Sequence, residues 1–243
     1  VQRRAEQAVG RQAAHIVTGS ETDAQRLRDW GCPHVMAIPT AYPRRPEPPD
    51  QARAERDRLR IIHLGSLETT ANRLGLTGYL QQAHQEATAQ CAAAAAPLAL
   101  WVIGDNRQVH PRLAALLAQP NVHQTGFVPD LETVLRPFDV AILPYEHDTG
   151  YRTKLPLLLS YAQVVVTTKA AVAGTQPAGL AAACVMVDRV TEFPAVLSQL
   201  ATRPEERERL GRAAHRFFMR HFTHAAVQPQ YAHLWQQVQV AQP

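Results

Sequence analysis

The sequence lacks long hydrophobic runs, paired cysteines and histidine ligand patterns. No apolar run approaches the roughly 20 residues that span a bilayer, and the best candidate, residues 92–103, is interrupted by Pro97. The three cysteines, Cys32, Cys91 and Cys184, lie far apart and form no Cys-x-x-Cys pair, so neither a zinc site nor a disulfide framework is indicated. The eleven histidines are scattered without a helical His-x-x-x-His pattern, and we therefore predict no metal site.

Signatures of several other protein classes are also missing. The chain has no Gly-x-Gly-x-x-Gly fingerprint, which counts against NAD, and no Gly-x-Ser-x-Gly elbow for a nucleophilic serine. The amino terminus, VQRRAEQAVGRQ, has no apolar core of a signal peptide, and it does not begin with Met. We therefore expect a cytoplasmic protein, of which this chain is a fragment or a processed product.

The charge balance is only mildly basic. Lys and Arg number 25 against 21 acidic residues, which gives a formal charge of +4 and a pI of about 9.2. This excess suits a phosphate ligand, or contact with an anionic membrane surface that would place the protein at the inner face of the membrane. It is too small to indicate nucleic acid, and we predict no nucleic-acid partner.

From residue 59 onward, apolar and β-branched runs alternate with helical segments. This order predicts an α/β fold, a doubly wound (Rossmann-like) six-stranded parallel sheet followed by C-terminal helices. The predicted strands are 60–65, 98–104, 121–126, 139–145, 164–168 and 183–188. The predicted helices between them are 74–96, 110–118, 130–136, 155–162, 175–182 and 191–202. Pro204 begins a further helix, and Thr223 caps a final one.

The first 60 residues follow a different pattern. Residues 1–14 and 21–31 read as helices, and residues 15–20 and 32–40 read as short strands. Four prolines between 43 and 49 then indicate a stiff linker, after which alternating charges up to residue 60 predict a short, solvated helix.

The most informative stretch is DVAILPYEHDTGYRTKLPLLLSYAQVVVTTK, residues 139–169. A strand that ends at Pro144 leads into a loop containing Gly150, Arg152 and Lys154, and then into a helix and another strand. Open α/β sheets bind their ligands at the carboxyl ends of their strands. A glycine there admits a ligand close to the backbone, while two cations and helix-start amides favour an anion. The expected ligand is a phosphate.

In its motifs the chain resembles the retaining glycosyltransferases of GT-B fold, the glycosyl transferases group 1 family, and in particular their C-terminal, donor-binding half. The resemblance covers residues 15–235. The matching positions are Ser20-Glu21, Ile38-Pro39, Gly65-Ser66-Leu67, Asn72, Gly75, Leu80, Gly126 to Pro129, Pro144, Gly150, Arg152, Lys154, Gly174 and Phe222-Thr223. The family's Asn-Gly after Ile-Pro is replaced by Thr40-Ala41.

This resemblance implies a hexosyltransferase-type enzyme of glycan biosynthesis. It would transfer a sugar from a nucleotide diphosphate sugar to an acceptor hydroxyl with retention, with no cofactor and no tightly held metal. Residues 1–43 would be the remnant of the N-terminal acceptor domain, 44–60 the linker, 61–223 the donor-binding domain and 224–243 a crossing helix. The acceptor would be held mostly by a missing N-terminal domain, so this chain alone would bind a donor at best.

The resemblance also implies roles for individual residues. Lys154 and Arg152 are the predicted catalytic residues, because their charges would stabilise the departing diphosphate. The predicted donor-binding residues are Gly65, Ser66, Asn72, Arg73, Phe127, Val128, Gly150, Tyr151 and Leu155. For Arg73, a solvated surface position is the alternative to a phosphate contact. His147 and Asp148 could face the sugar or the solvent.

Two family glutamates are replaced. The glutamate that accepts hydrogen bonds from the ribose stands three residues after the lysine, where this chain has Leu157, and the one eight positions earlier is Thr149. A leucine cannot accept these bonds. Two alternatives therefore stay open: a degenerate, non-catalytic module for nucleotide-sugar binding or assembly, and a nucleotide-sugar epimerase on the same fold.

Overall fold

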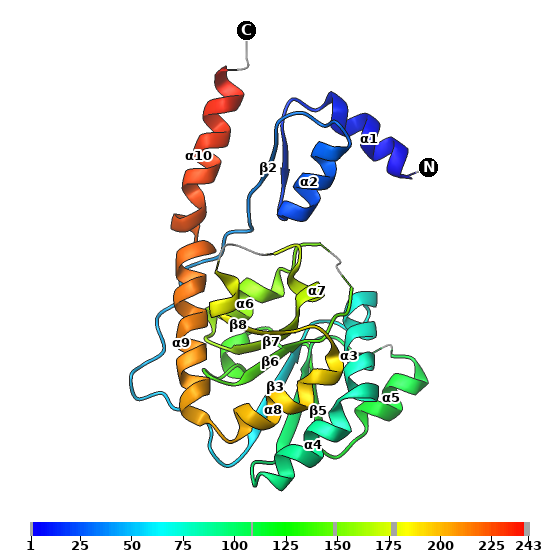
Figure 1. Ribbon diagram of the computed structural model, residues 1–243, viewed down its shortest axis with the longest axis vertical. Helices are drawn as coiled ribbons and strands as arrows, with labels where there is room; N and C mark the ends of the chain where they lie inside the picture. The colour runs from blue at the N-terminus through cyan, green and yellow to red at the C-terminus, as the bar shows by residue number, and fades with distance from the viewer. Residues whose placement is uncertain (1, 108, 148–149, 176–178, 241–243) are drawn as a thin grey trace.

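The computed structural model describes residues 2–107, 109–147, 150–175 and 179–240, and it is built around a six-stranded parallel sheet (Figure 1). The strand order β5-β4-β3-β6-β7-β8 confirms the predicted doubly wound sheet. The strands are β3 (Leu59–Leu64), β4 (Leu98–Ile103), β5 (Val122–Gly126), β6 (Val140–Leu143), β7 (Val164–Thr168) and β8 (Cys184–Val187).

Helices cover both faces of the sheet. One face packs against α3 (Thr70–Gln82), α4 (His84–Ala93), α5 (Pro111–Leu117) and α8 (Phe193–Ala201). The other packs against α6 (Lys154–Ser160) and α9 (Pro204–His221). Successive residues of β3, such as Ile61 and Ile62, therefore belong to two different cores. Every residue of β3, β6 and β7 is buried, which accounts for the mainly apolar sequence of these strands and leaves Arg60 and His63 of β3 as buried polar exceptions.

Three of the predicted helices differ from the structure. The segment predicted as one helix over 74–96 forms α3 and α4, because the backbone leaves the helical region at Ala83 (φ −133°). Residues 130–136 form only a 3₁₀ turn, Leu131–Thr133. The helix predicted over 175–182 is wrong: a helix, α7 (Lys169–Val172), starts directly after β7, and Leu180–Ala182 is a 3₁₀ turn. Residues 176–178 lie outside the described part.

The position of α7 follows from the last residue of β7. The Thr168 hydroxyl accepts a hydrogen bond from the backbone N–H of Ala171 at 3.1 Å, which caps the first turn. A 3₁₀ turn, Val190–Glu192, likewise precedes α8.

The first 40 residues form a small unit of their own elements. It comprises α1 (Gln2–Gln12), β1 (Ile16–Thr18), α2 (Glu21–Asp29) and β2 (Val35–Ala37), with β1 and β2 parallel. Figure 1 shows this unit beyond the sheet, near α7. It contacts the rest of the chain at several points: Thr22 Oγ1 donates to the Ala173 carbonyl at 3.1 Å, and Gly19 lies against the Tyr151 ring.

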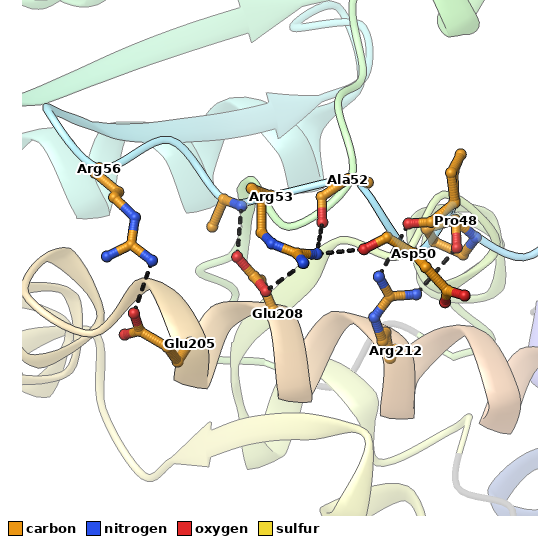
Figure 2. A network of polar contacts seen from close by, with 10 residues as sticks. Pro48, Asp50, Ala52, Arg53, Arg56, Glu205, Glu208 and Arg212 are labelled. Carbon is orange, nitrogen blue, oxygen red and sulfur yellow. Dashed lines mark hydrogen bonds and ion pairs between the residues drawn. The ribbon is translucent and has the colours of Figure 1, made fainter.

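The linker runs along α9 without forming the predicted short helix (Figure 2). Its charged side chains instead contact α9, as in the ion pair between Arg56 and Glu205 at 2.8 Å. The Arg212 guanidinium donates to the carbonyls of Pro48 and Pro49, both at 3.0 Å. Arg58 and Glu55 do pair within the linker at 3.1 Å, but other linker charges pair with a helix about 150 residues away in the chain, so the segment follows α9 instead of forming a helix of its own.

The last helix, α10 (His224–Val240), begins where the linker meets the end of α9. Tyr42 and Thr223 form an isolated parallel bridge. The Tyr42 N–H donates to the Phe222 carbonyl at 2.8 Å, and the His224 N–H donates to the Tyr42 carbonyl at 3.1 Å. Within the described part of the chain, no helix combines the length and apolarity needed to cross a bilayer.

Candidate functional site

The candidate site lies at the carboxyl ends of β3 and β6, where the sheet changes direction of winding. Gly65 follows β3 with φ +127°, and Gly104 follows β4 with φ +139°. A Cβ on Gly104 would lie 2.5 Å from the Gly65 carbonyl carbon, so the two loops touch backbone to backbone. Gly104 was not among the predicted site residues, although a glycine that ends a strand beside this crevice is a signal for close backbone approach.

Lys154 stands at the first position of α6 and reaches across to the loop after β3. Its Nζ donates to Asn72 Oδ1 at 2.5 Å and to the Tyr145 hydroxyl at 3.2 Å. A Cβ on Gly65 would lie 2.2 Å from this Nζ, so a side chain there would displace the ammonium, and the φ of +127° is itself strained for any residue but glycine. No ion pair formed by the described residues includes Lys154. It is a cation held by neutral oxygens.

Tyr145 and Asn72 complete this arrangement, which we call the lysine cluster (Gly65, Ser66, Asn72, Tyr145 and Lys154). The Tyr145 hydroxyl donates to Asn72 Oδ1 at 3.0 Å, and Asn72 Nδ2 donates to the Ser66 carbonyl at 2.7 Å. Burial raises the pKa of Tyr145 to about 12, so its phenol stays protonated at neutral pH. Tyr145 was missed as a site residue because a tyrosine at the end of an apolar strand reads as part of the core.

The surroundings of Lys154 are unfavourable for its positive charge. Burial, with a smaller effect of the nearby Arg152 charge, lowers the pKa of Lys154 to about 7. His63 on β3 is fully buried, and its two ring nitrogens have no hydrogen-bond partner among the described residues. Burial, and secondarily the Lys154 charge, hold the pKa of His63 well below its usual range. An anion at this point would stabilise the protonated lysine.

Arg152 lies beside the lysine cluster and is itself 9% exposed. Its guanidinium carbon is 4.0 Å from the centre of the Tyr145 ring, and its Nε donates to the Ala171 carbonyl at 3.1 Å. Arg152 and Tyr145 line a cavity of about 460 Å³ that also borders Gly75, Glu146 and His147. The site therefore offers a second fixed cation next to a volume typical of small-ligand pockets.

The comparison of the sequence with known families matches this part of the chain. Residues 58–203, which contain the whole site, match the profile of a family described as glycosyl transferases group 1. The chain belongs to this family. No curated protein sequence gives a match.

Solved structures share the GT-B glycosyltransferase fold with this group 1 chain. HepE from Anabaena, crystallised with UDP and glucose, is 12% identical with a TM-score of 0.68, over 96% of this chain and 66% of that one. Sucrose-phosphate synthase from Thermosynechococcus elongatus is 15% identical with a TM-score of 0.71, over 98% and 61%. WaaG, a glycosyltransferase involved in lipopolysaccharide biosynthesis, is 14% identical with a TM-score of 0.61, over 89% and 60%. The group 1 chain thus spans less than two thirds of each of these proteins.

The structure brings several of the predicted residues of this group 1 chain together. Gly65, Ser66, Asn72 and Lys154 form the lysine cluster, and Leu155 is buried in the core directly after it. Arg73 is tied to its own loop instead: its guanidinium donates to the carbonyls of Leu67 at 3.3 Å and Glu68 at 3.2 Å.

The turn after β5 lies at the same edge of the sheet as the lysine cluster. The Gly104 N–H donates to the Gly126 carbonyl at 2.8 Å, which places the turn next to the loop that touches Gly65. Phe127 is 76% exposed, and Val128 packs partly against the core. Both side chains are apolar, so neither forms a hydrogen bond with the lysine cluster.

Two residues of the loop before α6, Gly150 and Tyr151, contact different parts of the molecule. Gly150 (φ +81°) lies against Gly174, where a Cβ would come within 2.7 Å of the Gly150 carbonyl carbon. The Tyr151 ring packs on Gly19 of the N-terminal unit, at 3.1 Å from the position of a Cβ there, and so faces away from Lys154. Asp148 and Thr149 lie outside the described residues. Leu157 packs partly against the apolar core, and α6 (KLPLLLS) carries no acid.

Proposed function

We propose that this chain is the C-terminal, donor-binding half of a retaining glycosyltransferase and that the lysine cluster binds the diphosphate of a nucleotide diphosphate sugar. The observation that carries the proposal is Lys154, a partly buried cation at the switch point of a group 1 family sheet that has no carboxylate partner among the described residues. An anionic ligand would supply the charge that the protein does not.

The chemistry of the protein would be electrostatic. As the glycosidic bond breaks, negative charge grows on the departing diphosphate, and Lys154 and Arg152 would stabilise it from fixed positions. The backbone amides of the loop after β3 would contact the same group. The cavity beside Arg152 would receive the sugar, with Glu146 and His147 as polar groups along its wall.

The division of the chain follows from this function. Residues 61–223 would bind the donor, residues 44–60 would link them to a remnant of an acceptor domain in residues 1–43, and residues 224–243 would cross toward that domain. The acceptor hydroxyl would then be held mostly by residues upstream of this chain. Because structural neighbours were crystallised with UDP and UDP-glucose, uridine nucleotides are the first donors to test.

A non-catalytic nucleotide-sugar module is the second candidate, and the apolar surface of α6 favours it. Leu157 offers no acceptor to ribose hydroxyls, and each such bond to a charged acceptor contributes about 1.5–3 kcal/mol. A donor could still bind through its diphosphate. Binding without sugar transfer, measured on the full-length gene product, would favour this candidate.

Calorimetric titration with UDP, GDP, ADP and dTDP tests the donor site. We expect one of these nucleotides to bind, and we expect Lys154→Met to weaken it about tenfold to a hundredfold, because one charge-assisted contact is lost. The chain offers a matched control: its only other lysine, Lys169, is exposed and pairs with Asp188 at 2.8 Å. Lys169→Met should bind as the wild type does.

Two outcomes would reject the proposal. One is an absence of binding by the wild-type protein to any of the four nucleotides. The other is equal affinity of wild type and Lys154→Met, with circular dichroism showing that both are folded.

A further inference from the structure

A second cationic pocket lies on another face of the molecule, between the linker and the last turns of α9. It encloses about 430 Å³. We call it the arginine pocket; its charged and polar lining residues are Arg44, Arg45, Glu47, His215, Arg216 and Arg220. Four guanidinium groups thus surround one carboxylate, and none of these residues belongs to the lysine cluster.

Elsewhere along the linker and α9, charged side chains have partners within the protein (Figure 2). Toward the start of α9, Glu205 pairs with Arg56 and Glu208 accepts from the Ala54 N–H at 3.1 Å. Arg209 pairs with Glu206 at 2.7 Å, and Arg212 donates to linker carbonyls. Arginines in this part of the interface therefore have acceptors within the protein.

The arginines of the pocket differ from these. Arg44, Arg216 and Arg220 are exposed, and none takes part in an ion pair among the described residues. A cation near a helix C-terminus interacts favourably with the helix dipole, which accounts for Arg220. It does not account for Arg44, which comes from the linker and brings a further positive charge to the same pocket. The four guanidinium groups outnumber the one carboxylate of the pocket, Glu47, so like charges repel one another there, and an anionic ligand would reduce this repulsion.

One wall of the pocket is rigid. The Arg45 guanidinium stacks 3.7 Å from the centre of the Tyr161 ring and pairs with Glu132 at 2.5 Å. The Arg45 carbonyl contacts His215 Nε2 at 3.2 Å, and His215 is 2% exposed. The pocket therefore combines a fixed wall with three arginines that are available to a ligand.

We propose that the arginine pocket is a binding site for a phosphate group. Guanidinium forks match the oxygens of a phosphate in pairs, and three unpaired forks around one cavity can bind it from several sides. The group could belong to a soluble phosphate or to the headgroup of an anionic lipid. This site is independent of the proposed donor site, because the two share no residue.

The test compares two triple variants of the whole chain. Arg44→Gln, Arg216→Gln and Arg220→Gln together remove the available cations. Arg26→Gln, Arg56→Gln and Arg209→Gln remove the same formal charge from exposed, ion-paired arginines elsewhere. Two probes separate the sources of the group: inorganic phosphate, followed by NMR titration at constant ionic strength, and vesicles of phosphatidylcholine with or without phosphatidylglycerol, followed by co-sedimentation.

We expect the wild type to bind at least one probe, the pocket variant to bind it at least tenfold more weakly, and the control variant to change less than twofold. Binding to phosphate alone assigns the site to a soluble ligand, whereas binding only to vesicles with phosphatidylglycerol assigns it to a lipid. Lys154→Met should retain this binding, which separates the pocket from the donor site. The proposal is overturned if neither probe binds the wild type, or if both triple variants lose binding equally.

Discussion

The two ends of the β3–β6 strand pair each hold a positively charged side chain, but the partners of that charge differ. At the amino end, the Arg60 guanidinium on β3 donates to Asp139 Oδ2, just before β6, at 2.5 Å. At the carboxyl end, the partners of the Lys154 ammonium among the described residues are the neutral oxygens of Asn72 and Tyr145. Both cations are partly or fully buried, but within the described part of the chain Arg60 has a carboxylate partner and Lys154 has none.

At the amino end, the buried Arg60 and Asp139 have their partners within the protein. Arg60 and Asp139 are 7% and 6% exposed, Arg60 also donates to the Val134 carbonyl at 2.7 Å, and its guanidinium lies 4.7 Å from the centre of the Trp101 ring. Burial raises the pKa of Asp139 to about 6 while Arg60 opposes the rise, so the pair is ionised at pH 7. Arg60 and Asp139 thus neutralise each other within the protein.

The difference between the two ends shows that one sheet can carry a charge pair that is neutralised within the protein at one end and a cation suited to a ligand at the other. A matched buried pair holds strands together, whereas an unmatched cation lowers stability until a ligand arrives. Three sets of variants test this comparison.

The largest effect is expected at the amino end. Arg60→Leu should lower the free energy of unfolding by about 3–5 kcal/mol, because it leaves the Asp139 carboxylate buried without a partner. Urea unfolding at pH 7 measures this loss. The double variant Arg60→Leu/Asp139→Leu should recover most of it, and a double variant as unstable as the single one would contradict the ion-pair interpretation.

A smaller gain is expected beneath the lysine cluster. His63→Leu should raise the free energy of unfolding by about 1–3 kcal/mol, because it removes a buried ring whose nitrogens have no partner. The pKa of His63 is lowered in the folded state, so the unfolded chain binds more protons below its ordinary value of 6.5. The wild type should therefore lose stability as the pH falls through 6.5, and the variant should lose less. Parallel pH profiles for the two proteins would contradict this account.

The smallest effect is expected at Lys154 itself, and it depends on pH. Because its folded-state pKa is about 7, well below the ordinary value, the unfolded chain binds more protons between pH 7 and about 10. Wild-type stability should therefore rise across this range. Removing the unfavourable charge is partly offset by losing the hydrogen bonds to Asn72 and Tyr145. Lys154→Met should therefore be more stable than the wild type by on the order of 1–2 kcal/mol at pH 7, and this gain should disappear as the pH rises toward 10.5.

Thermal unfolding with and without the nucleotide found by titration completes the comparison. At one fixed concentration, the nucleotide should stabilise the wild type more than Lys154→Met, since the variant binds it more weakly. Lys169→Met should show neither the gain at pH 7 nor the loss of ligand response. A Lys169→Met protein that behaves like Lys154→Met would show that net charge, rather than position, is responsible.

The sequence allowed the sheet to be predicted because its central strands β3, β6 and β7 are buried on both faces. The predicted range 164–168 coincides with β7, and the range 98–104 extends β4 by a single residue. Such runs of apolar and β-branched residues have few other structural explanations. Helix boundaries were less predictable, since the segment around the break at Ala83, QQAHQEA, contains neither glycine nor proline.

Part of the candidate site could also be predicted from the sequence. Gly65, Asn72 and Lys154 stand in recognisable positions of the chain, and the fold brings them within contact distance. Tyr145 was not predictable as a partner of Lys154, because its role depends on the packing of α3 against the loop after β6. The Arg60–Asp139 pair joins residues 79 positions apart, and no local pattern indicates such a contact.

The bridge between Tyr42 and Thr223 bears on how the molecule can bend. The chain passes between the N-terminal unit and the sheet once before the linker and again between α9 and α10, and backbone hydrogen bonds fasten these two passages to each other. A rotation of one body against the other about this point would leave these bonds in place, but it would break the contacts of Thr22 with Ala173 and of Gly19 with Tyr151. The N-terminal unit and α10 would swing together, opening or closing the space above the carboxyl ends of the strands.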